Sequence, residues 1–191
     1  MKLTILILIY MNLLSCVTTE KTPPESVKLH PVFNQYYGCA EHHKGQFQGV
    51  GDALGTDCYI IKSRKIDGRS WFRRFKNNGH KNEDWFGWRQ PVLSPIAGKI
   101  VRINENKVTN EPGILGKGMS TFLIIQGENR LHAMIAHLRE LEVKVGDVVE
   151  RGQIVGKVGN NGQSWFPHIH IGAWIGKEPK QIRFDQSKII N

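Results

Sequence analysis

From Gln90 onward, short apolar runs alternate with turn residues along the chain. Three of these runs span residues 98–103, 120–125 and 130–137, and a further one runs from His168 to Trp174. Short runs rich in Val, Ile and Phe, bounded by Gly, Asn or Ser, are typical of β-strands. The pattern therefore predicts a mainly β fold, an antiparallel and barrel-like sheet in a single domain.

Glycine-rich turns divide these strands. Gly127-Glu128-Asn129 is expected to join two strands into a hairpin, and residues 104–119 and 159–167 are expected to be loops. In the N-terminal half, Asp67-Gly68 separates two strand-like runs, 58–62 and 69–73, which predicts another hairpin. Residues 143–159 are expected to form two short strands.

The chain begins with a segment of different character. Lys2 precedes an apolar run that ends by Leu14, which is too short for a membrane-spanning helix and is typical of a secretory signal over residues 1–15. Leu13-Leu14-Ser15-Cys16 resembles the lipobox of bacterial lipoproteins, which implies lipidation of Cys16. Polar residues 16–28 are expected to be a linker, followed by an N-terminal part of the domain, 29–79, and a catalytic core, 80–191.

Export changes how the cysteines and the charge are interpreted. With Cys16 lipidated, Cys39 and Cys58 are an even pair in an oxidising compartment, and a disulfide between them is expected. The alternative is that one of them is a buried thiol or a metal ligand. The formal charge of +9 favours anionic surfaces, and outside the cell these are peptidoglycan and its attached polymers rather than nucleic acid. The expected location is extracytoplasmic, anchored to the membrane by lipid, and the chain is expected to be a monomer.

Histidines carry the candidate chemistry. His168 and His170 lie two residues apart in an extended segment, so both imidazoles project from one face and can divide metal binding and proton transfer between them. His80 and Asp84 lie four residues apart and would complete a three-ligand zinc site with one open position. Strand alternation places His137 on the face opposite His132, so only one of these two can face the site.

Five ordered motifs support this grouping and suggest a family. They are His80-x-x-x-Asp84, residues 91–101, Ala136-His137-Leu138, residues 145–156 and Pro167-His168-Ile169-His170. In order and spacing they resemble the lysostaphin-type zinc endopeptidases, which cut peptidoglycan peptides and have a duplicated hybrid-motif fold. The resemblance implies that zinc is held by His80, Asp84 and His170, with His137 and His168 as catalytic histidines.

The residues leave two alternatives open. The family usually has a glycine within its His-x-x-x-Asp segment, which is absent here, and Asp57 follows a glycine by two residues downstream of His42 and His43. His43 and Asp57 are therefore an alternative ligand pair, with His170 common to both sets. The second alternative concerns function: the chain is expected to be a metalloendopeptidase of peptidoglycan, but an inactive relative that binds cell wall or activates a partner hydrolase has the same fold. The sequence contains no motif that indicates which peptidoglycan bond is cut.

Overall fold

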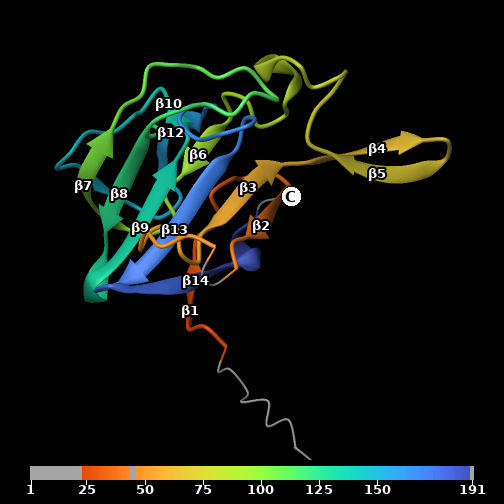
Figure 1. The fold of residues 1–191 in the computed structure, drawn as a ribbon. Helices are drawn as coiled ribbons and strands as arrows, with labels where there is room; N and C mark the ends of the chain where they lie inside the picture. Colours follow the sequence, from red (N-terminus) through yellow and green to blue (C-terminus); the bar gives the residue numbers. More distant parts are fainter. Residues whose placement is uncertain (1–22, 44–45, 190–191) are drawn as a thin grey trace, which may run out of the picture.

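The computed structural model describes residues 23–43 and 46–189, and Cys16 lies outside this range. The fold is mainly β, as the sequence pattern predicts, with a large sheet that curls into a half-barrel (Figure 1). The strands of this sheet occur in the order β1-β14-β13-β9-β8-β7-β11, and β3, which also pairs with β2, adds to β13 beside β14. Their bounds are β1 (Ser26–Leu29), β2 (Tyr37–Glu41), β3 (Thr56–Ile60), β7 (Gly98–Asn104), β8 (Phe122–Gln126), β9 (Leu131–Ala136), β11 (Val148–Val149), β13 (Ile169–Ile175) and β14 (Glu178–Phe184).

Two smaller sheets and three short 3-10 helices complete the fold of the residues that the structure describes. One sheet has the order β10-β12-β6 and the other is the hairpin β4-β5, which projects away from the rest of the molecule (Figure 1). The bounds are β4 (Lys62–Ile66), β5 (Arg69–Arg73), β6 (Pro91–Leu93), β10 (Leu138–Arg139), β12 (Ile154–Val158), η1 (Asn82–Asp84), η2 (Glu128–Arg130) and η3 (Gln186–Lys188).

One hydrophobic core lies between the large sheet and the β10-β12-β6 sheet. Ile100, Leu123 and Ile135 from the large sheet belong to the same buried cluster as Val92 and Val155 from the small one. Burying both apolar faces against each other removes this surface from water and is the main stabilising term of such a fold. Within the described part of the chain, no helix has the length and apolar character needed to cross a membrane.

The turns mostly agree with the sequence prediction. The β8-β9 hairpin turns at Gly127 and η2, and the β4-β5 hairpin turns at Asp67 and Gly68, which both have positive φ. The first strand of that second hairpin is 62–66 rather than 58–62, because residues 56–60 instead form β3 between β2 and β13.

Two other boundaries differ from expectation. Residues 26–28, assigned to the linker, form part of β1 and pair in parallel with β14. In the segment 143–159, the first expected strand shortens to β11, because a turn in which Asp147 accepts the Lys144 backbone N–H occupies the preceding residues.

Candidate metal centre

Strand register brings the candidate metal ligands together. In β13, His170 is the register partner of Asp57 in β3, and Asp57 is in turn the partner of Ala40 in β2. Register partners project from the same face of a sheet, and so does a residue two positions further along a strand. His42 therefore lies on the face of Asp57 and His170, while His43 projects from the opposite one.

The disulfide Cys39–Cys58 joins β2 to β3 next to this group. The two cysteines are themselves register partners, so the cross-link fits the pairing that the sheet already has. The expected disulfide is thus present, and neither cysteine is available as a metal ligand. Its consequence for the site is that the strand leading to His42 is fixed against the strand that carries Asp57.

His42, Asp57 and His170 form a compact group of donors. One potential ligand atom from each lies within 4.8 Å of the other two, and among the residues that the structure describes no other set of His, Cys, Asp and Glu does so. His170 Nδ1 lies 3.0 Å from Asp57 Oδ1, and His42 Nε2 lies 3.6 Å from the same oxygen. Two imidazoles and one carboxylate are a donor set that suits zinc with an open coordination position. These residues therefore fit the metal that the sequence predicts.

His80 and Asp84 are not brought to His170, so the expected ligand set is corrected at two positions. Asp84 is buried, and its carboxylate accepts hydrogen bonds from the Asn77 side chain and the Lys81 backbone N–H. It closes the turn around η1. His80 is exposed, and its backbone N–H donates to Asn78. The alternative that contains Asp57 is the one that the structure supports, with His42 in place of His43.

The predicted catalytic histidines lie beside this group. The rings of His137 and His168 have centroids 4.6 Å apart, and both side chains are buried. His168 Nε2 lies 3.7 Å from Asp57 Oδ1. His132 instead stacks on Trp174 at the other end of β9, so the expectation that only one of the two histidines reaches the site is confirmed.

Both histidines are oriented through Nδ1. His137 Nδ1 lies 2.8 Å from the Asn161 carbonyl oxygen, and His168 Nδ1 lies 2.7 Å from that of Phe166. A carbonyl only accepts, so Nδ1 carries the hydrogen in each ring and Nε2 is left as the reactive nitrogen. His137 reaches this position because it follows β9 with φ 61°, a left-handed conformation that turns the chain out of the strand.

Burial and charge set the protonation of the site. Burial opposes a charge on His170, but hydrogen bonds to Asp52 and Asp57 raise its pKa to about 9. Burial, with a smaller contribution from His168, lowers the pKa of His137 to about 3. Burial alone would raise the pKa of Asp57, yet His168 and His170 together hold it well below its usual range. Around neutral pH, Asp57 is thus a carboxylate and His137 a neutral imidazole.

These groups line a cleft of about 610 Å³. Trp165 and Phe166 form part of its wall, and Trp165 is 52% exposed. Phe166 stacks on Trp85 with centroids 4.7 Å apart. Leu115 and Met119 from the loop 104–119 contribute apolar surface on another side. The cleft therefore combines polar histidines and aspartates with an aromatic and apolar wall, and its volume is in the range of ligand-binding pockets.

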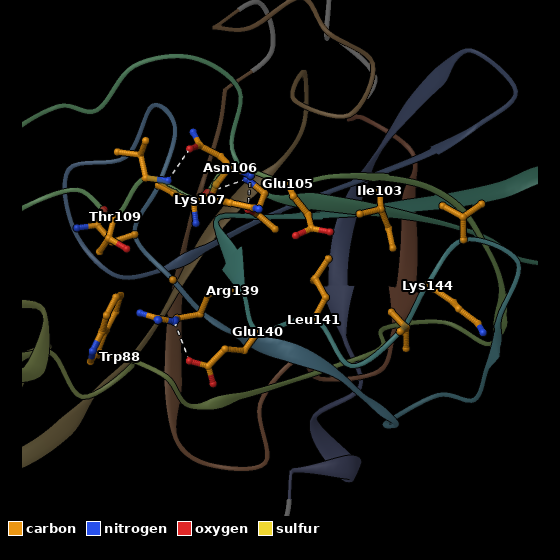
Figure 2. Close-up of a pocket in the computed structure, with 17 residues that line it drawn as sticks. Trp88, Ile103, Glu105, Asn106, Lys107, Thr109, Arg139, Glu140, Leu141 and Lys144 are labelled. Carbon is orange, nitrogen blue, oxygen red and sulfur yellow. Dashed lines mark hydrogen bonds and ion pairs between the residues drawn. The ribbon is translucent and has the colours of Figure 1, made fainter.

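A second cavity, of about 550 Å³, shares no lining residue with this cleft (Figure 2). Figure 2 shows Arg139 and Glu140 on one wall and Glu105 and Lys107 on another. Hydrogen bonding to Lys157, followed by that to Arg89, lowers the pKa of Glu140 to about 2. The cavity wall also contains Asn161, whose carbonyl oxygen holds His137, so this cavity lies behind that histidine.

Comparison with known proteins identifies the family. The family model for Peptidase family M23 matches residues 79–182, more than half of the chain. The chain belongs to peptidase family M23. The match begins after His42 and Asp57, so two members of the metal group lie upstream of the matched segment.

Individual relatives agree with this assignment. The chain is 28% identical over 111 residues to an uncharacterized metalloprotease of Buchnera aphidicola, an alignment that covers 56% of this chain and 27% of the relative. It is 31% identical over 85 residues to lysostaphin of Staphylococcus staphylolyticus, covering 44% of this chain and 16% of that protein. The chain thus spans less than a third of the length of these curated relatives. The solved structure of the M23 metalloprotease pseudoalterin from the deep sea has a similar fold, with a TM-score of 0.51, 16% identity and coverage of 81% of this chain and 75% of that one.

Proposed function

We propose that this M23 peptidase is a zinc-dependent endopeptidase that hydrolyses peptide bonds of peptidoglycan. The observation that carries the proposal is the convergence of His42, Asp57 and His170 beside the paired rings of His137 and His168. The first three residues would hold the metal. When bound, zinc supplies Lewis-acid chemistry, because it polarises a carbonyl and lowers the pKa of a water ligand to about 7.

The chain's own residues supply the proton transfers. His168 Nε2 faces Asp57 and carries no hydrogen in the neutral ring, so it accepts a proton from the water that attacks the peptide carbonyl carbon. As the C–N bond breaks, the same nitrogen returns this proton to the leaving amine. The Phe166 carbonyl accepts from Nδ1 throughout and keeps the ring in place. His137, with its low pKa, stays neutral, and its Nε2 carries no hydrogen and can therefore accept a hydrogen bond from a group in the cleft.

The decisive experiment is digestion of purified sacculi by the purified chain, with and without a chelator, followed by mass analysis of the released peptides. Zinc content is measured on the same protein. Zinc binding together with chelator-sensitive release of peptides supports the proposal and identifies the bond. Zinc binding without release would assign the chain to the second candidate, an M23 module that binds cell wall or activates a partner hydrolase. A chain that binds no zinc would exclude the endopeptidase.

The composition of the β4-β5 hairpin supports the proposal that the partner is a polyanionic cell wall. Residues 62–73 contain five cations and one carboxylate. The register places Arg64 opposite Trp71, and Arg69 and Arg73 lie two residues to either side of Trp71, so the three guanidinium groups share the face of an indole that is 51% exposed. Guanidinium groups suit phosphate and carboxylate, and an exposed indole suits the apolar face of a sugar. This face would retain the enzyme on peptidoglycan and its anionic polymers.

We propose that the chain acts outside the cytoplasm as a lipoprotein anchored through Cys16. The Cys39–Cys58 disulfide supports this location, because disulfides persist in oxidising compartments. Intact-mass analysis of the protein from its native membrane should show a lipid-modified N-terminal cysteine. Cys16→Ala should move the protein from the membrane to the soluble fraction, and unchanged membrane association would contradict the anchor.

A further inference from the structure

The loop between β2 and β3 carries a carboxylate that the proposed mechanism does not use. Asp52 contacts both histidines of the metal group. Its backbone carbonyl oxygen lies 3.2 Å from His42 Nδ1, and its side-chain Oδ1 lies 3.1 Å from His170 Nε2. One residue is thus bonded to each of the two imidazoles that would hold the metal.

These contacts determine which nitrogen of each ring is free. The Asp52 carbonyl can only accept, so His42 carries its hydrogen on Nδ1 and presents Nε2. His170 Nε2 is next to the Asp52 carboxylate and lies 3.4 Å from the Gly51 carbonyl oxygen, so it donates to oxygen on that side and presents Nδ1. The two presented nitrogens are the ones that lie 3.6 and 3.0 Å from Asp57 Oδ1. Residue 52 therefore directs both rings toward one point.

Residues 51–55 of this loop are held in place firmly enough to do this. Gly55 N–H donates to the Asp52 carbonyl, and His42 N–H donates to the Gly55 carbonyl, which ties the loop to the end of β2. A Cβ at Gly55 would lie 2.5 Å from His170 Cε1, and one at Gly172 in β13 would lie 1.5 Å from the Gly51 carbonyl oxygen. Both positions require glycine because the loop backbone lies directly against β13.

We propose that Asp52 is a positioning residue of the metal centre, which fixes the tautomer and ring orientation of His42 through its carbonyl and of His170 through its carboxylate. The inference rests on the proposed function, since it assumes that these histidines bind zinc. Partners behind metal-binding histidines commonly change metal affinity by about 10–100-fold. Because the backbone carbonyl survives substitution, changing the side chain tests the His170 contact alone.

The test measures how fast zinc leaves the purified, zinc-loaded chain in the presence of excess chelator. The release rate is the appropriate quantity because protonation of the metal-free histidines does not affect it. Asp52→Ala removes the carboxylate and should speed release by about 10–100-fold. Asp52→Asn retains an oxygen that can accept a hydrogen bond from His170 Nε2. Its rate of zinc release should lie between that of Asp52→Ala and that of the unchanged protein. Asp67→Asn, in the turn of the distant hairpin, is the matched control and should release zinc at the original rate.

A second readout separates positioning from direct ligation. With Co²⁺ in place of zinc, the visible absorption spectrum reports the ligand set, and it should be the same for Asp52→Asn as for the unchanged protein. An altered spectrum would show that Asp52 is itself a ligand and would overturn the inference. Release from Asp52→Ala at the original rate would also overturn it while leaving the proposed function intact. If the unchanged protein takes up neither metal, the proposed function fails first.

Discussion

Asp57 and His170 face each other across β3 and β13, with Oδ1 of one 3.0 Å from Nδ1 of the other. The two residues are 113 positions apart in the sequence. Their contact is a direct result of strand pairing, because register partners project from the same side of the sheet. The candidate metal centre therefore rests on two paired strands, with Asp57 in β3 and His170 in β13, and this suits a site that must hold its ligands in fixed positions.

Ligand identity is the first prediction. His42→Ala and Asp57→Ala should each weaken zinc binding by more than about 100-fold, because each removes one of three ligands, whereas loss of a supporting residue costs less. Zinc stoichiometry after dialysis and competition with a chromophoric chelator measure this. His80→Ala is the matched control and should bind zinc normally. If His42→Ala bound zinc normally and His80→Ala lost zinc binding, the ligand set expected from the sequence would be the correct one.

The second prediction separates proton transfer from metal binding. His168→Ala should retain zinc and lose about 10²–10⁴-fold in the rate of peptide hydrolysis, since it removes the group that accepts and returns the proton. Zinc content and turnover are measured on the same preparation. Full turnover by this variant would show that His168 has no such role.

The disulfide provides the third prediction. Replacing Cys39 and Cys58 together by Ser should lower the free energy of unfolding by about 3 kcal/mol, the value expected for a loop closed over a separation of 19 residues. Thermal or denaturant unfolding measures the loss. Because the cross-link fixes β2 beside β3, zinc should also bind less tightly. An unchanged unfolding midpoint would mean that the sheet alone holds this pairing.

A pH dependence follows from His170. In the metal-free protein, Asp52 and Asp57 raise its pKa to about 9 despite burial, so the ring is protonated at neutral pH. Zinc needs an unprotonated imidazole and must displace this proton. Zinc affinity should therefore rise with pH up to about 9, by roughly tenfold for each unit. Competition titrations at pH 7, 8 and 9 test this, and an affinity that is constant over that range would contradict it.

The last prediction concerns the hairpin. Replacing Arg64, Arg69 and Arg73 by Ser and Trp71 by Ala should reduce co-sedimentation with sacculi several-fold, because the cationic and aromatic face is lost. Cleavage of a short soluble peptide should be unchanged, since the hairpin is not part of the cleft lining.

A charge-matched control distinguishes this face from net charge. Lys99, Lys144 and Lys177 are exposed and lie outside the hairpin. Replacing these three by Ser removes the same number of cations and should leave sedimentation nearly as before. Equal losses in both variants would mean that overall charge, and not the hairpin face, retains the protein on the wall.

Much of the fold is encoded locally and could be predicted from sequence. Gly127 and Gly68 sit in turns where the chain reverses, and the apolar runs between the turns form the strands. The same local rule placed His168 and His170 at adjacent positions on one face, and it separated His137 from His132. The relative positions of reactive groups that lie close in sequence on a regular strand can be predicted without the tertiary fold, because the backbone alone sets their spacing.

Asp84 shows where local reasoning failed. Its spacing from His80 is the same as that of a metal-ligand pair, yet its carboxylate accepts hydrogen bonds from the Asn77 side chain and the Lys81 backbone N–H in a turn. Gly55, two residues before Asp57, was the available signal for the other pair. The choice between His42 and His43 required the Ala40–Asp57 register, which decides the face on which each side chain lies.

The sequence by itself therefore determined the β fold and the spacing of His168 and His170, because these depend on alternation and turns between near neighbours. Only the tertiary structure decided which residues join His170. His42, just after β2, and Asp57 in β3 are far from β13 in the chain, and the pairing of β3 with β13 is a long-range event that no short spacing encodes. The role inferred for Asp52 has the same origin, since a loop of the first half lies against a strand of the second.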